Sequence, residues 1–110
     1  MPAAQRELLK GNTDALLLSL LQDEPRYGYQ LIKEIERRSQ GYFKFREGTL
    51  YPALHRLEKE GLVDGRWQGS SGGQERRYYR LTEKGRGVLQ AKMAEWHGFS
   101  RAVNLVMGAS

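Results

Sequence analysis

The sequence predicts a mainly α-helical fold that carries one two-stranded β-ribbon. Three observations predict it: three short segments with helical apolar spacing come first, two alternating segments joined by a Gly-Ser loop follow, and one long helical segment comes last. A chain of 110 residues suits one compact unit, which should bury about two-thirds of its unfolded surface. We divide this unit into residues 1–81, which hold the short helices and the ribbon, and residues 82–110, which form the last helix.

The first two helices are indicated by clusters of leucine and isoleucine. One extends from Glu7 to Gln22, and we expect its leucine-rich second half to be buried. Pro25 follows this helix, and the residue before a proline leaves the helical region, so the helix ends there. The other extends from Tyr27 to Ser39, with Leu31 and Ile35 on its inner face.

The third helix is predicted between residues 47 and 61. Leu50, Leu54 and Leu57 follow one another at the spacing i, i+4 and i+7, so they form a single stripe on one face. Pro52 lies near the start, where its missing N–H costs little. The stripe should pack on the core and leave the opposite face of the helix in solvent.

Two strands are predicted after the third helix, over residues 62–68 and 75–81. The second strand reads ERRYYRL, and its alternate residues fall on opposite faces, so the ribbon should present two different surfaces. Residues 69–73, which read GSSGG, join the strands as a flexible tip. The ribbon is therefore a hairpin with a basic second strand.

The last helix opens at Thr82, a good capping residue. Its apolar side chains recur close to the heptad spacing of a coiled coil and form one stripe. The stripe consists of Leu89, Met93, Trp96, Phe99, Val103, Val106 and Met107. Residues 1–81 are too few to cover it, so we expect a homodimer in which this helix packs against the same helix of a second subunit.

The net charge of +5 is concentrated in two places. Residues 37–46 carry four basic side chains and no acidic one, and residues 66–86 carry six basic side chains against two acidic ones. The rest of the chain has a slight acidic excess. Two basic segments on a small domain are typical of a protein with a polyanionic partner, most commonly nucleic acid.

Several classes of protein are excluded by residues that the sequence lacks. With no cysteine, it forms no disulfide, thiolate metal site or thiol nucleophile. The two histidines, His55 and His97, fit no metal or nucleophile pattern, so we expect no enzyme, metal or cofactor. The longest charge-free apolar stretch, residues 15–22, is far shorter than the ~20 residues of a membrane helix. Because the N-terminus also does not resemble a signal peptide, we expect a cytoplasmic protein with no membrane partner.

Three helices followed by a basic ribbon form a winged helix-turn-helix, a fold whose third helix enters the major groove of DNA. The solvent face of that helix offers hydroxyls, a ring donor, a cation and apolar surface to phosphates and base edges. The segment before the helix and the wing should add backbone contacts. The candidate DNA-binding residues are Tyr27, Lys44, Arg46, Thr49, Tyr51, Pro52, His55, Arg56, Gly72, Gly73, Arg76 and Arg77.

Four motifs resemble the PadR family of transcriptional regulators. GTLYPALHRLEKEGLV at residues 48–63 resembles the third helix of that family, and YGYQL at residues 27–31 resembles the opening of its second helix. RYYRLTEKG at residues 77–85 resembles its second wing strand and the start of its last helix, and LKG at residues 9–11 completes the set. The single C-terminal helix is similar to that of the compact subfamily. This resemblance implies a homodimeric repressor that binds an inverted repeat in double-stranded DNA and is released by a small ligand.

Several interpretations remain open beside these. In multidrug-responsive members of the family, a tryptophan of the last helix stacks on flat apolar ligands, so Trp96 either binds such an effector or fills only the dimer core. The pocket would be lined by Leu8, Ala15, Met93, Trp96 and Phe99. Tyr51 could instead pack beneath the wing, and His55 could be an ordinary solvated histidine. A winged helix can also serve as a protein-interaction module, although a basic wing disfavours that role.

Overall fold

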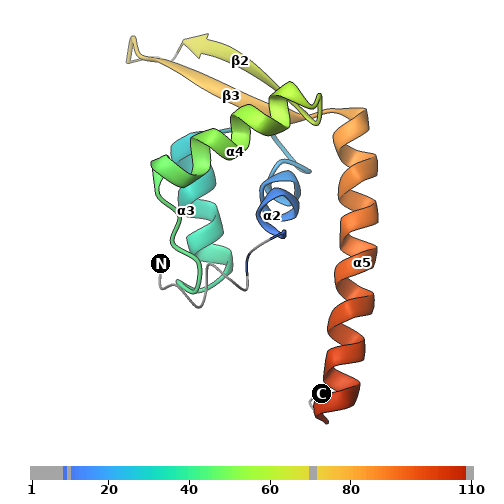
Figure 1. The fold of residues 1–110 in the computed structure, drawn as a ribbon. Coiled ribbons are helices and arrows are strands. Elements are labelled where there is room, and N and C mark those ends of the chain that lie inside the picture. Colours follow the sequence, from blue (N-terminus) through green and yellow to red (C-terminus); the bar gives the residue numbers. More distant parts are fainter. Residues whose placement is uncertain (1–8, 10, 70–71, 109–110) are drawn as a thin grey trace.

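The computed structural model describes residue 9, residues 11–69 and residues 72–108. It confirms the mainly helical fold with a β-wing and a long last helix, in the predicted order (Figure 1). The third helix and both wing strands lie within two residues of their predicted bounds. The elements are α2 (Thr13–Leu20), β1 (Arg26–Tyr27), α3 (Gly28–Arg38), α4 (Glu47–Lys59), β2 (Val63–Gly69), β3 (Glu75–Leu81) and α5 (Glu83–Met107).

The first helix is shorter than predicted over the described residues. Gly11 has φ of +86°, in the left-handed region that glycine adopts readily, and α2 begins only at Thr13. The predicted start at Glu7 and the neighbouring Leu8 lie outside the described residues. The interruption was visible in the sequence as a Gly-Asn pair in the middle of the segment.

The sheet has three strands instead of the predicted two. The short β1 pairs antiparallel with β3, with Arg26 opposite Tyr79 and Tyr27 opposite Tyr78, and β3 lies between β1 and β2. A strand of two residues has no alternation to detect, so the hydrophobic pattern could not reveal it. The consequence is that the start of α3 is bound directly to the wing.

The two faces of the ribbon differ as predicted. On one face, Tyr79 of β3 pairs across from Gly65 of β2, and Arg77 pairs across from Trp67. Burial on this face decreases from the base of the ribbon, where Tyr79 is buried, to the tip, where Trp67 is exposed. The opposite face carries Arg76 with the other alternate residues of β3.

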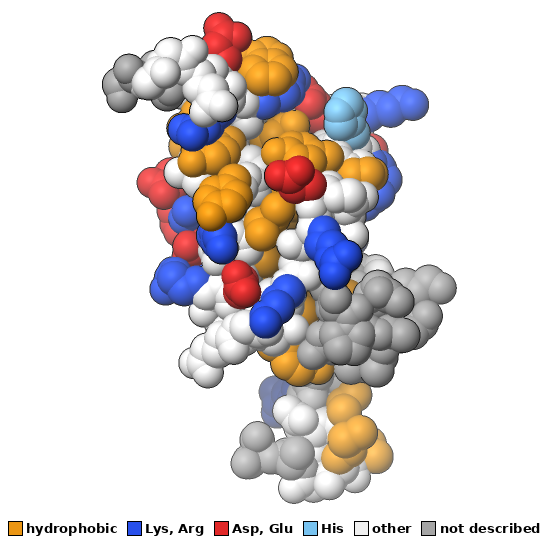
Figure 2. Space-filling model, turned by 90° about the vertical axis from the view of Figure 1, so that its left-hand side faces the viewer, with side chains coloured by type: hydrophobic (Ala, Val, Ile, Leu, Met, Phe, Trp, Pro, Cys, Tyr) orange, Lys and Arg blue, Asp and Glu red, His pale blue; other side chains and the backbone are white. Residues whose placement is uncertain are grey.

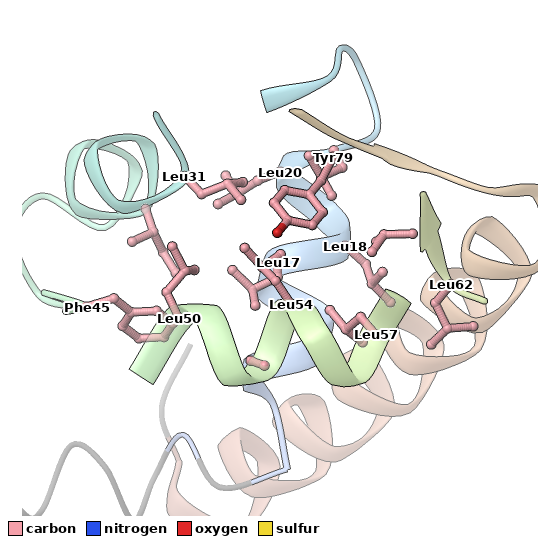
Figure 3. Packing of buried hydrophobic residues seen from close by; sticks show 14 of the residues in the cluster. Leu17, Leu18, Leu20, Leu31, Phe45, Leu50, Leu54, Leu57, Leu62 and Tyr79 are labelled. Atoms are coloured by element: carbon pink, nitrogen blue, oxygen red, sulfur yellow. The ribbon is translucent and has the colours of Figure 1, made fainter. Parts of the chain in front are cut away.

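The core lies between α2, α3, α4 and the base of the ribbon (Figure 3). Leu50, Leu54 and Leu57, the predicted stripe of α4, are fully buried and belong to one cluster with the leucines of α2. Tyr79 reaches into this cluster from β3. Burial of each large apolar side chain contributes about 1.5–3 kcal/mol, so the cluster holds α4 and the ribbon base together.

The start of α5 is tied to the end of α4. The Thr82 hydroxyl accepts the N–H of Gly85 at 3.0 Å and donates to the carbonyl of Gly61 at 2.7 Å. The Lys84 ammonium donates to the carbonyl of Glu60 at 2.9 Å. Beyond this base, α5 passes α2 and extends away, which gives the molecule a longest axis of 54 Å (Figure 1). In the described part of the chain, no helix has both the length and the apolar character needed to cross a membrane.

Candidate nucleic-acid interface

The solvent face of α4 carries the predicted recognition residues. Thr49, Tyr51, Pro52, His55 and Arg56 are all exposed, on the side opposite the buried leucine stripe. The predicted division of this helix into a core face and a solvent face is therefore confirmed. Their contacts with DNA remain a prediction.

Pro52 stands farther inside α4 than predicted. The helix begins at Glu47, so Pro52 is its sixth residue and lies beyond the first turn. At this position the missing N–H would have bonded to the carbonyl of Gly48. Gly48 is exposed, so water can hydrate that carbonyl in place of the lost helical bond.

A groove of about 690 Å³ lies between α4, the start of α3 and the ribbon. Five predicted DNA-binding residues line it together: Tyr27, Tyr51, His55, Arg76 and Arg77. Figure 2 shows the molecule from the side of the wing tip, where apolar side chains lie among basic ones in the upper half. The groove thus brings rings, hydroxyls, imidazole and guanidinium groups into one place, and these groups contact sugar-phosphate backbone and base edges in protein–DNA complexes.

Tyr51 is seated against the first residue of α3. A methyl group in place of the hydrogen of Gly28 would lie 2.6 Å from Cζ of Tyr51 and would overlap its hydroxyl. Any side chain at this position would therefore force Tyr51 to move. The contact places the Tyr51 ring in the wall of the groove while leaving it partly exposed.

Three basic candidates are available to a phosphate. Lys44 and Arg46 are exposed in the loop before α4, and Arg76 lies 4.6 Å from the centroid of an aromatic ring of β1. Among the described residues, none of the three takes part in an ion pair. Gly72 and Gly73 at the wing tip are exposed as well.

Arg56 and Arg77 are held by carboxylates of the same chain. Arg56 donates to Asp14 of α2, with 2.5 Å between Nη2 and Oδ1. Arg77 donates to Glu58 of α4, with 2.5 Å between Nη2 and Oε2. Before Arg56 or Arg77 can contact a phosphate, its guanidinium group must therefore leave its carboxylate or bind both anions at once. The sequence did not reveal these ion pairs.

Part of the basic excess in residues 37–46 is neutralised locally. Arg37 and Arg38 both donate to Glu34 on the preceding turn of α3, Arg38 through Nε at 2.9 Å. These hydrogen bonds lower the pKa of Glu34 to about 2. The i,i+3 and i,i+4 spacings are those at which helix side chains meet, so the two arginines form part of a surface ion cluster.

Trp67 and Tyr29 line the same groove and were not predicted. Trp67 is 62% exposed on β2 and stands opposite Arg77 in the ladder. Residues directly opposite each other in an antiparallel pair share a face. The hairpin register would therefore have placed Trp67 beside Arg77, but the length of the tip leaves that register open in the sequence.

The apolar stripe of α5 is largely uncovered within one chain. Its exposed members are Met93, Trp96, Phe99, Val106 and Met107. Trp96 is 50% and Phe99 is 64% exposed, with 6.1 Å between their ring centroids. Val103 is partly covered, whereas Leu89 is fully buried in the core of its own chain. The surface open to a partner therefore starts at Met93.

Residues 17–91 match the family described as the transcriptional regulator PadR-like family. The chain belongs to this family. The match extends from the second half of α2 to the first part of α5 and so includes both α4 and the wing. PadR proteins are DNA-binding transcriptional regulators and not enzymes.

Relatives of this PadR protein match most of its length. Transcriptional regulator Rv3488 of Mycobacterium tuberculosis is 36% identical over 84 residues, which cover 76% of this chain and 75% of the relative. A PadR family regulator from Eggerthella lenta has a TM-score of 0.82 at 32% identity and covers 98% of this chain and 92% of its own. A PadR-like regulator from Bacillus cereus has a TM-score of 0.82 at 32% identity, with coverages of 94% and 99%. The shared fold therefore includes α5.

Proposed function

We propose that this PadR protein represses transcription by binding a palindromic DNA operator as a homodimer. The observation that carries the proposal is the groove between α4 and the wing, where polar, aromatic and cationic groups converge next to an exposed helix face. The choice of repression over activation rests on the resemblance to the family.

The recognition helix in this proposal is α4. Its exposed face enters the major groove, whose width admits a helix. Thr49 and His55 offer hydrogen bonds to base edges, and the rings of Tyr51 and Pro52 offer apolar surface to thymine methyls. The cations before α4 and on the wing bind phosphates and fix the position of the helix along the duplex.

The second subunit is recruited by α5. The uncovered stripe from Met93 to Met107 exposes apolar side chains to water, and burying them against a second α5 gains about 25 cal/mol for each Å². A two-fold axis between the two helices presents two copies of α4 to successive major grooves, about 34 Å apart. This symmetry is why the operator is expected to be an inverted repeat.

A small apolar or aromatic effector is proposed to bind between the subunits, next to Trp96. Trp96 and Phe99 hold partly exposed rings at an interplanar angle of 35°, and Met93 lies one turn before Trp96. Ala15 of α2 is half-buried, and Leu8 lies outside the described residues. In the alternative, Trp96 fills the dimer core without a ligand. Quenching of tryptophan fluorescence by planar apolar dyes, lost in Trp96→Ala, distinguishes the effector site from the alternative.

The proposal is tested by a fluorescence anisotropy titration of the protein against duplex from the upstream region of its own gene, with random duplex as the control. We expect preference for the upstream duplex, and a log–log dependence on salt with a slope of about −0.9 for each phosphate contacted. Equal affinity for both duplexes would refute sequence-specific regulation and favour the protein-interaction module. Sedimentation at micromolar concentration tests the dimer separately, and a monomer would refute that part.

A further inference from the structure

Arg77 does not extend into solvent as a wing arginine that binds phosphate would. Its side chain is 29% exposed. It lies on the face of the ribbon that carries Tyr79, where it forms its ion pair with Glu58 of α4. Within the described residues, this is the only side-chain hydrogen bond that joins the ribbon to α4. Apart from the apolar packing at the base of the ribbon, the wing is therefore linked to the recognition helix through one guanidinium group.

The sequence provides space for this link at Gly65. A methyl group at Gly65 would lie 2.7 Å from Nε and 2.8 Å from Nη2 of Arg77. Gly65 is an ordinary strand residue without positive φ, so the need for glycine is one of space. Arg77 thus passes over β2 at Gly65, where no side chain stands in its way.

Two aromatic rings flank the same guanidinium group. Its Cζ lies 5.7 Å from the ring centroid of Trp67 and 5.9 Å from that of Tyr79. Both distances are within the range of a cation–π attraction. Tyr79 is buried in the core, so this contact places Arg77 against the core.

Glu58 stands at a position where a carboxylate is unfavourable unless a cation is bound to it. It occupies the last turn of α4, at the negative end of the helix dipole, where a carboxylate is destabilising alone. It also lies close to the face that the proposed function brings to DNA, a polyanion. An acid at this position is explained if its task is to hold Arg77.

We propose that Arg77 is a positioning residue that sets the angle between the wing and α4. Glu58 binds its guanidinium group, and Gly65 leaves the space that this contact needs. The inference rests on the proposed DNA-binding function. Arg77 then contributes to affinity by holding the wing at the angle to α4 that fits the duplex, and not by neutralising a phosphate itself.

The decisive variant is Glu58→Gln, because the two roles of Arg77 predict opposite signs. If Arg77 positions the wing, loss of its partner weakens operator binding about tenfold with the salt slope unchanged. If Arg77 instead binds phosphate, removal of a nearby acid strengthens binding and frees the cation. Tighter binding by Glu58→Gln therefore overturns the proposal.

Two further variants and one control complete the comparison. Gly65→Ala displaces Arg77 and should reproduce the effect of Glu58→Gln, with no further loss when the two are combined. Arg77→Lys keeps the charge but loses the planar fork, so it should also weaken binding at constant slope. The control Arg76→Ala should make the salt slope shallower by about 0.9. A slope change of that size in Arg77→Ala would overturn the positioning role.

A measurement without DNA separates failure of the positioning role from failure of the proposed function. In a Trp96→Phe background, Trp67 is the only remaining tryptophan, and its quenching by acrylamide reports how well Arg77 covers it. We expect Glu58→Gln to raise the quenching constant, whereas an unchanged constant would show that the ion pair does not hold Arg77. If the wild type binds no DNA, the proposed function fails and the quenching result alone decides whether Arg77 holds the wing.

Discussion

Gly85 and Gly87 lie two residues apart near the start of α5, and replacement by alanine should affect stability in opposite directions. At Gly85, an added methyl group would overlap the carbonyl oxygen of Leu62 and lie 2.8 Å from Cδ1 of Leu81. At Gly87, the same methyl group meets nothing within 4 Å. Both positions are helical, so intrinsic helix propensity favours alanine at both.

The magnitudes follow from these two surroundings. Overpacking costs about 1–3 kcal/mol, and at Gly85 the cost should be about 2–3 kcal/mol because a backbone carbonyl cannot move aside as a side chain would. The propensity gain of at most ~1 kcal/mol leaves Gly85→Ala destabilised by about 1–2 kcal/mol. With a Tm shift of roughly 4 °C for each kcal/mol, we expect a decrease of about 4–8 °C. Gly87→Ala should raise Tm by about 2–4 °C through its gain of 0.5–1 kcal/mol.

The assay is thermal unfolding followed by circular dichroism at one fixed protein concentration, because association makes Tm depend on concentration. A Tm for Gly85→Ala equal to or above the wild type would refute the packing of α5 on the carbonyl of Leu62. A decrease for Gly87→Ala of the same size would show that the loss reflects some general effect of glycine replacement. The pair therefore tests the attachment of α5 and not merely the stability of the protein.

Three more predictions follow from single contacts. Gly28→Ala should push Tyr51 out of the groove wall and weaken DNA binding while circular dichroism shows the fold intact. Thr82→Ala removes the cap of α5 and should lower the free energy of unfolding by about 1 kcal/mol in urea titrations. Burial raises the pKa of Tyr79 above 10, so the folded state keeps a proton that the unfolded chain releases. Stability should therefore fall as pH rises through 10 and beyond, and Tyr79→Phe should reduce that dependence.

The features predicted correctly were those that local pattern determines. The leucine stripe of α4 and the alternation of β3 each depend on a spacing within one segment, and such a spacing settles which face is buried. Thr82 was recognisable as a cap because its partner stands three residues away. The ion cluster around Glu34 was not predicted, although its partners stand only three and four residues away along the same helix.

The features missed were those that depend on distant pairing. Arg56 finds its carboxylate 42 residues earlier and Arg77 finds its own 19 residues earlier. The sequence shows that both residues are cations but not that either forms an ion pair, so both were predicted to bind DNA. Only the fold, which brings α2 and the ribbon to α4, determines which cations remain available to a phosphate.

The attachment of the wing at its base makes the wing behave as a lever. A seven-residue strand such as β2 is about 23 Å long at 3.3 Å for each residue. A rotation of 5° about the anchored base would then move the tip by roughly 2 Å, more than the range of distances that a hydrogen bond tolerates. Small changes near the base, at Gly65 or Glu58, are therefore amplified along the strand. Fine adjustment of where the tip meets a duplex can be achieved by residues that never touch it.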